Sequence, residues 1–215
     1  MLKTILFQGD SITDCDRGRD WEHNEMGVGY ATMVAGALGA AAPYQYRFYN
    51  RGIGGNRIVD IYARIKSDII NLKPDYMSLL IGVNDVWHEL DFQNGVDAEK
   101  FEMLYGLLID EIKAELPELK IMILEPFVFP GSATASADDS GKYAYFRKET
   151  ELRAQAAMRV AQKYDLAFVP LQNIFDEADA DAPAPGYWLW DGVHPTAAGH
   201  ELIKQEWLKA FELLK

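Results

Sequence analysis

The alternation of five short apolar runs with longer segments of helical periodicity constrains the fold of this chain more than any other feature. Short apolar runs bounded by turn residues are typical of strands that are buried on both faces of a parallel sheet. Strands that alternate with helices favour right-handed crossovers, which place helices over both faces. We therefore predict an α/β fold, a three-layer α/β/α sandwich with a five-stranded parallel sheet. The expected strands are Lys3–Gln8, Tyr44–Tyr49, Tyr76–Ile81, Lys120–Leu124 and Leu166–Val169.

The segments between these runs carry apolar residues at helical spacing. Isoleucines at positions 58, 61, 65 and 69 recur at intervals of three and four, which predicts one amphipathic helix over residues 57–71. Two segments rich in small and acidic residues, 129–141 and 176–186, are expected to be surface loops. The first of them follows the end of the fourth strand, where it could also rim a site. Further helices are expected at residues 29–38, 101–112, 143–164 and 202–214.

Length and charge narrow the class of protein. A chain of 215 residues is expected to form a single domain over residues 1–215. Its 33 acidic and 21 basic residues give a net charge of −12, which disfavours binding to nucleic acid or to an anionic membrane. Cys15 is the one cysteine, which excludes an internal disulfide and a cysteine-cluster metal site. The apolar run at the N-terminus is too short for a signal-peptide core, so we expect a cytoplasmic protein, and a homo-oligomer is compatible with these features.

Three motifs directly follow the first three expected strands. Residues 9–14 are Gly-Asp-Ser-Ile-Thr-Asp, residues 50–56 are Asn-Arg-Gly-Ile-Gly-Gly-Asn, and residues 82–85 are Gly-Val-Asn-Asp. Each motif alone is equally compatible with a turn or a helix cap. The second is not a dinucleotide fingerprint, because Arg57 stands where the third glycine is required. A parallel sheet brings the strand ends to one edge, so we expect Ser11, the glycine turn and Asn84 to lie close together.

A fourth motif, Asp-Gly-Val-His at residues 191–194, follows the last expected strand. A carboxylate three residues before a histidine can fold back across the glycine and accept a hydrogen bond from the imidazole Nδ1–H. The Nε2 atom of His194 would then face outward as a base. The alternative is a capped helix start with a surface histidine. The four motifs together supply a nucleophile, a base, an orienting acid and oxyanion donors, which is what acyl transfer by a serine requires.

In this order the four motifs resemble the four blocks of the SGNH, or GDSL, hydrolase superfamily, and they span residues 9–194. The resemblance implies that Ser11 is the nucleophile, His194 the base and Asp191 the partner of that base. It also implies an oxyanion hole made by the Ser11 backbone N–H, the Gly55 backbone N–H and the Asn84 side chain. The superfamily fold, a five-stranded parallel sheet between helices, agrees with the pattern of apolar runs.

Residues 9–15, 81–87 and 190–200 are similar to the intracellular acetylxylan esterase branch of this superfamily. That similarity implies a serine carboxyl-ester hydrolase, which removes short acyl groups, above all acetyl, from carbohydrate esters such as acetylated xylo-oligosaccharides. The reaction would pass through an acyl-enzyme on Ser11. A lipase-, lysophospholipase- or thioesterase-like acyl hydrolase is the alternative. Trp87 and Trp190 flank the third and fourth motifs, where they either stack on a sugar or pack in the core.

Two other classes of function remain open at this point. A metallophosphoesterase could use His23, His88 and His200 as ligands, but no histidine pair has the usual ligand spacing and Ser11 would have no role. We therefore expect no metal and no cofactor. A sugar-binding module without catalysis is the other class. A degenerate site would usually have lost Ser11 or His194, and both are present.

Overall fold

The structure is a computed structural model that describes residues 2–19, 25–135 and 141–215. Within these residues it contains a five-stranded sheet in the order β2-β1-β3-β4-β5. Every pair of neighbouring strands is parallel, which confirms the predicted α/β fold. The strands are β1 (Lys3–Gly9), β2 (Tyr46–Asn50), β3 (Tyr76–Leu80), β4 (Lys120–Leu124) and β5 (Ala167–Val169).

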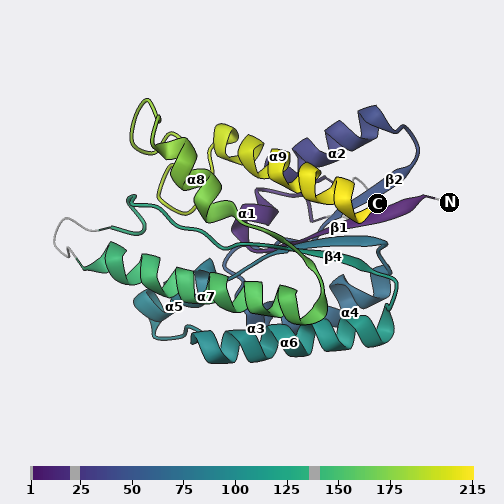
Figure 1. Cartoon of the computed structure of the whole chain (residues 1–215), viewed down its shortest axis with the longest axis horizontal. Helices are drawn as coiled ribbons and strands as arrows, with labels where there is room; N and C mark the ends of the chain where they lie inside the picture. Colours follow the sequence, from purple (N-terminus) through teal and green to yellow (C-terminus); the bar gives the residue numbers. More distant parts are fainter. Residues whose placement is uncertain (1, 20–24, 136–140) are drawn as a thin grey trace.

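Helices cover both faces of this sheet, and they form the two outer layers in Figure 1. One layer contains α2, α8 and α9, and the other contains α3 to α7. Among the described residues, no helix combines the length and the apolar character that crossing a bilayer requires. The helices are α1 (Ser11–Asp14), α2 (Tyr30–Ala41), α3 (Ile58–Ala63), α4 (Ile65–Asp68), α5 (Val83–Phe92), α6 (Ala98–Glu115), α7 (Lys142–Tyr164), α8 (Leu171–Asp179) and α9 (Ala197–Leu214), with a 3-10 turn η1 (Ile70–Leu72).

Alternate side chains of the strands enter two separate hydrophobic cores. In β1, Ile5 and Phe7 enter the core beneath α2 and α9, where the Phe7 ring lies 5.3 Å from that of Trp207. Leu6 points to the opposite core, beneath α3 and α6. All of these side chains are fully buried, and burial of one such side chain stabilises the fold by about 1.5–3 kcal/mol. The two cores explain why the strands are apolar on both faces.

The single helix expected over residues 57–71 is wrong, because the structure divides this segment into α3, α4 and η1. The break falls at Arg64, whose backbone leaves the helical region at φ −114° and ψ 17°. Its guanidinium donates hydrogen bonds to the carbonyl oxygen of Arg51 at 2.8 Å and to the side chain of Asn56 at 2.9 Å. The four isoleucines are still buried, so the periodicity identified the inward face and missed the interruption.

Two helices lie where the sequence analysis expected none. Helix α5 follows the third motif directly, and its buried residues Val83 and Val86 have helical spacing. Helix α8 extends to Asp179 and so occupies the start of the predicted loop at residues 176–186. Leu171 and Phe175 bury one face of α8. Of the predicted loop at 129–141, residues 136–140 lie outside the described residues.

Candidate active site

Ser11 is the first residue of the short helix α1, directly beyond strand β1, which lies between β2 and β3 in the sheet. The turn from strand to helix requires Gly9, because a Cβ atom there would lie 2.4 Å from the Leu80 carbonyl oxygen and from the Thr13 hydroxyl. Asp10 caps the helix, and its carboxylate accepts the Ile12 N–H at 3.0 Å. The sequence therefore fixes the Ser11 hydroxyl at the carboxyl edge of the sheet.

The side chains of Ser11, His194 and Asp191 form a continuous hydrogen-bonded series. The Ser11 Oγ atom lies 2.8 Å from His194 Nε2, and His194 Nδ1 lies 2.7 Å from Asp191 Oδ2. A carboxylate can only accept at this position, so Nδ1 carries the proton and Nε2 accepts the Ser11 hydroxyl proton. The structure thus brings together the three residues that the first and fourth motifs supplied.

A tight turn holds Asp191 and His194 in this orientation. The second oxygen of the Asp191 carboxylate, Oδ1, accepts the backbone N–H groups of Val193 at 2.9 Å and of His194 at 2.8 Å. Gly192 has a φ of +96°, and a Cβ atom there would lie 2.4 Å from the Phe129 carbonyl oxygen. The Asp-Gly-x-His spacing is therefore a steric requirement of this turn.

The charges around His194 favour its role as a base. Burial disfavours the imidazolium, but the hydrogen bond and charge of Asp191 outweigh burial and raise the pKa of His194 above its usual value. Burial also acts to raise the pKa of Asp191, yet the bonds from His194 and Val193 hold that pKa below the usual range for a carboxyl. Asp191 is therefore ionised at neutral pH and stabilises the protonated form of His194.

The glycine turn after β2 lines the hollows around Ser11. A turn closes between Ile53 and Asn56 with an N–H to carbonyl bond of 3.2 Å, and Gly55 adopts a φ of +80° within it. The neighbouring Gly54 N–H donates to the Asp14 carboxylate at 2.9 Å, so it is already engaged. Gly55 and Ser11 line the same hollow, and because the Gly54 N–H is engaged, Gly55 stays the predicted oxyanion donor of this turn.

Asn84 supplies a side-chain amide on the same side of Ser11. It lies in the first turn of α5, is only 5% exposed, and donates one amide N–H to the Asn56 carbonyl oxygen at 3.2 Å. Asn84 does not cap α5, since Gly82 occupies the N-cap position without a side-chain bond. Asp85 caps a different helix, because its buried carboxylate accepts the N–H of Ile58 in α3 at 3.1 Å. The cap interpretation of this motif is thus wrong for Asn84.

Two hollows meet at the Ser11 hydroxyl and His194. The first, here called the Trp190 hollow, has a volume of about 340 Å³ and is partly walled by Trp190 and Pro195. The second, the Trp87 hollow, has a volume of about 310 Å³ and contains Gly55, Asn84, Trp87 and Phe92. An ester carbonyl placed against Ser11 can therefore direct its two substituents into separate spaces.

The two tryptophans singled out in the sequence both contact the catalytic histidine candidate. The Trp190 ring stacks on His194 with a centroid distance of 5.6 Å and an angle of 18°, and it is 62% exposed. The Trp87 ring lies 6.0 Å from His194, and its indole N–H donates to Asp91 at 2.7 Å. Exposure of so large an aromatic surface beside a reactive group favours ligand stacking over core packing for Trp190.

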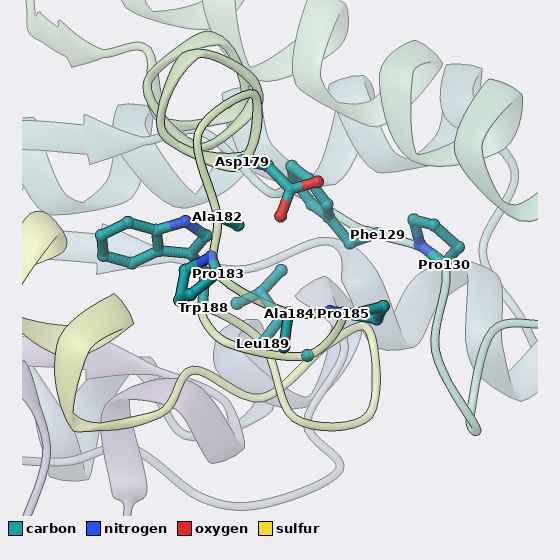
Figure 2. A pocket seen from close by; sticks show the side chains of 10 residues that line it. Phe129, Pro130, Asp179, Ala182, Pro183, Ala184, Pro185, Trp188 and Leu189 are labelled. Carbon is teal, nitrogen blue, oxygen red and sulfur yellow. The ribbon is translucent and has the colours of Figure 1, made fainter.

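Trp188 also precedes the fourth motif, but it lines a separate cavity. Its indole N–H donates to the Ala178 carbonyl oxygen at 3.0 Å, and its ring lines a cavity of about 420 Å³ on the other side of the 188–195 segment. Figure 2 shows that Asp179, Phe129 and a proline-rich stretch complete this cavity. Ser11 and His194 are not among its lining residues.

The histidines that a metal site would need do not come together among the described residues, where no group of three or more His, Cys, Asp or Glu side chains could hold a metal ion. His200 packs against α2: its Nδ1 atom accepts the Tyr30 N–H at 3.1 Å, and Nε2 lies 3.4 Å from Cys15 Sγ. Burial lowers the pKa of His200 to about 4. His88 borders the Trp87 hollow, and His23 lies outside the described residues.

A parallel α/β sheet with a serine, a histidine and a carboxylate in series at its carboxyl edge, and with N–H donors beside the serine, defines the class of α/β serine hydrolases. Residues 7–202 match the sequence model of the GDSL-like Lipase/Acylhydrolase family. The chain belongs to this family and is an esterase of the GDSL, or SGNH, type.

Individual proteins with similar sequences and structures agree with this assignment. An acetylxylan esterase of Geobacillus stearothermophilus is 32% identical over 214 residues, which cover 95% of this chain and 92% of that protein. The crystal structure of Axe2, an acetylxylan esterase of the same organism, has a TM-score of 0.83 at 31% identity and covers 97% and 93% of the two chains. A candidate GDSL-like lipase from Parabacteroides merdae has a TM-score of 0.89 at 35% identity, with 99% and 98% covered.

Proposed function

We propose that this esterase removes acetyl groups from carbohydrate esters such as acetylated xylo-oligosaccharides, by way of an acyl-enzyme on Ser11. The observation that carries the mechanism is the hydrogen-bonded series from Ser11 through His194 to Asp191, with bonds of 2.8 and 2.7 Å. Geometry of this kind lets one imidazole serve as base and then as acid without a change in position.

The first half of the reaction forms the acyl-enzyme. Ser11 Oγ attacks the ester carbonyl carbon while His194 Nε2 takes the hydroxyl proton, and the carbonyl oxygen becomes an oxyanion. The Ser11 N–H, the Gly55 N–H and the Asn84 amide donate hydrogen bonds to that oxyanion. The bond between the carbonyl carbon and the sugar oxygen then breaks, and His194 donates its proton to the departing hydroxyl.

The second half releases the acid. A water molecule attacks the carbonyl carbon of acetyl-Ser11 while His194 Nε2 takes a proton from that water. A second oxyanion forms on the same donors, the Oγ–carbon bond breaks, and His194 returns the proton to Ser11 Oγ. The products are acetic acid, which ionises to acetate, and the regenerated hydroxyl. Asp191 stays ionised throughout and stabilises the imidazolium in both halves.

Two observations support a carbohydrate as the alcohol part of the substrate. Trp190 exposes its ring beside His194, which must protonate the departing oxygen, so a pyranose leaving group would lie against that ring. The proteins named above as acetylxylan esterases share more than 90% of their length with this chain.

One feature favours the lipase-like alternative. The Trp87 hollow is walled by Trp87 and by Phe92, which is 69% exposed, and its volume exceeds what an acetyl methyl group fills. Longer acyl chains would bury this aromatic surface and gain about 0.8 kcal/mol per methylene group. A preference for octanoyl over acetyl esters is the expected outcome under this alternative.

A substrate panel separates these functions. We expect the highest kcat/KM on acetylated xylo-oligosaccharides, with values on 4-nitrophenyl esters that fall from acetyl to butyryl to octanoyl. The opposite order, or preferred hydrolysis of a lysophospholipid, would establish the lipase-like function instead. Absence of turnover on every ester by folded protein, together with binding of xylo-oligosaccharides, would establish a sugar-binding module.

A pair of variants tests the role of Trp190. Trp190→Ala should raise KM for acetylated xylo-oligosaccharides about 3- to 10-fold, because it removes a stacking surface, and should change KM for 4-nitrophenyl acetate much less. Tyr187→Ala is the matched control, since Tyr187 is also an exposed aromatic of this segment but its ring packs on Trp188 at 4.8 Å. Equal effects of both variants would contradict the stacking role.

A further inference from the structure

The four-residue helix α1 carries two polar side chains that contact neighbouring parts of the site, and the proposed mechanism uses only one of them. Ser11 is at its first position and Asp14 at its last. The Asp14 side chain is 9% exposed and does not act on the Ser11–His194 pair. Its Oδ2 atom accepts the backbone N–H of Gly54 at 2.9 Å. The helix that presents the nucleophile is thereby bonded to the turn that presents the Gly55 N–H.

The Gly54 bond attaches the glycine turn to the helix that carries Ser11. The Ile53 N–H donates to the Gly9 carbonyl oxygen at 3.1 Å, and the Asn56 N–H closes the turn back to Ile53 at 3.2 Å. Between these two bonds lie the peptide groups of Gly54 and Gly55. Two consecutive glycines restrict their own backbone very little. The Gly54 N–H shares its planar peptide group with the Ile53 carbonyl oxygen, which accepts the Asn56 N–H. The bond to Asp14 therefore holds this closed turn, and with it the neighbouring Gly55, against α1.

Arg19, which is half-exposed, forms an ion pair with the Asp14 carboxylate. Its guanidinium donates two hydrogen bonds, at 3.0 Å to Oδ1 and at 2.6 Å to Oδ2. Burial acts to raise the pKa of Asp14, but Arg19 and the Gly54 N–H outweigh burial and lower that pKa below the usual value. The Asp14 carboxylate is therefore ionised in the range where an esterase with a histidine base operates, and its hydrogen bond to Gly54 is charge-assisted.

We propose that Asp14 is a positioning residue for the oxyanion hole, which acts by holding the Gly54–Gly55 turn against the nucleophile helix. This proposal rests on the function proposed above, because it needs Ser11 as nucleophile and Gly55 as a donor. The alternative role, direct binding of a sugar hydroxyl in the Trp190 hollow, makes a different prediction: it affects KM for sugar esters, whereas a positioning role affects kcat for every ester.

Three substitutions at Asp14 separate the hydrogen bond from the charge. Asp14→Ala removes the acceptor, and kcat on 4-nitrophenyl acetate should fall about 10- to 100-fold with little change in KM, below the 10²- to 10³-fold loss typical for outright removal of a donor. Asp14→Asn keeps an acceptor without the charge, so its kcat should lie between those of the wild type and Asp14→Ala. Asp14→Glu keeps the charge but displaces the oxygen by one methylene group, so its kcat should lie below that of Asp14→Asn.

Arg19→Ala is the matched control for the ion pair. It leaves the Gly54 bond in place and removes only a partner that is 56% exposed, so kcat should stay within threefold of the wild-type value. Melting temperatures of all four variants show whether each is folded. If Asp14→Ala does not fold, the comparison of Asp14→Asn with Asp14→Glu replaces it, because only the position of the oxygen and the charge differ there.

The same assays distinguish failure of this proposal from failure of the proposed function. Wild-type protein that does not hydrolyse 4-nitrophenyl acetate would overturn the function itself. Active wild type together with an Asp14→Ala kcat within threefold of wild type would overturn only the role of Asp14. Three other results would also overturn the role of Asp14. They are a kcat of Asp14→Asn no higher than that of Asp14→Ala, a kcat of Asp14→Glu at least equal to that of Asp14→Asn, and an effect confined to KM on sugar esters.

Discussion

Asn84→Ala tests the proposed chemistry at a single amide group. One N–H of this amide is bonded to the Asn56 carbonyl oxygen, and the second is the one proposed to bond the oxyanion. The negative charge on that oxygen exists mainly in the transition state, so loss of the donor should lower kcat and leave KM nearly unchanged. Removal of one such donor typically costs about 10²- to 10³-fold in rate, or roughly 3–4 kcal/mol of transition-state stabilisation.

The effect on stability should be much smaller than the effect on rate. The substitution removes one neutral hydrogen bond, worth about 1 kcal/mol, which shifts Tm by about 2–4 °C in a domain of this size. Both acylation and deacylation pass through an oxyanion on the same donors, so kcat on 4-nitrophenyl acetate falls whichever step limits turnover. A Tm clearly below that of the wild type with kcat within threefold would refute the oxyanion role and leave Asn84 with a structural one.

Asn84→Asp is the comparison variant for this test. It preserves the shape of the side chain and replaces the N–H donor with an acceptor that carries negative charge. Repulsion between this carboxylate and the oxyanion should make kcat at least as low as in Asn84→Ala. A variant with near-normal kcat would show that the amide does not face the reacting oxygen.

Three further outcomes are expected. Ser11→Ala should lower kcat by about 10⁶-fold with the fold intact, and retention of a tenth of the wild-type activity would exclude Ser11 as the nucleophile. The kcat/KM profile should rise through a pKa above about 6.5, because the base must be neutral and Asp191 raises the pKa of His194 in spite of its burial; a flat profile from pH 5 to pH 9, with chemistry limiting, would exclude His194. Incubation with EDTA should leave turnover of 4-nitrophenyl acetate unchanged, since in the proposed mechanism Ser11 is the nucleophile, His194 the base and Asp191 its ionised partner. Loss of activity that a divalent cation restores would favour a metallophosphoesterase-like mechanism.

The sheet was predictable because buried parallel strands leave a strong signal in the sequence. Ile5, Leu6 and Phe7 are fully buried on alternating sides of the sheet. A short apolar run of this kind is typical of a parallel strand that is buried on both faces. The helix boundaries were less predictable. Arg64 has ordinary helix propensity, and the break there accompanies hydrogen bonds from its guanidinium to the Arg51 carbonyl oxygen and the Asn56 side chain, which periodicity does not reveal.

The four motifs predicted which residues form the candidate site. The hydrogen bonds between the motifs could be identified only in the structure. The series from Ser11 to His194 joins positions 183 residues apart, and strand order alone makes that approach plausible. Asp14 looked like a local cap by residue type. Its bond to Gly54 spans 40 residues and has no sequence signal, because it depends on how closely the glycine turn packs against α1.

The topology separates the parts of this site that must be fixed from the parts that are free to vary. The order β2-β1-β3 places the segments after three neighbouring strands beside one another, so Ser11, Gly55 and Asn84 are held by backbone that the sheet determines. Trp190 comes instead from the long segment after α8, which is bonded to the segment after β4 by the Phe129 N–H to Gly192 carbonyl bond of 2.8 Å and the Ala133 N–H to Asp191 carbonyl bond of 3.0 Å. Changes in that segment would reshape the alcohol side of the site without moving the oxyanion donors. Asp191 and His194 belong to the same segment, so a change at Trp190 can reshape the alcohol side only where the turn of residues 191–194 keeps its hydrogen bonds.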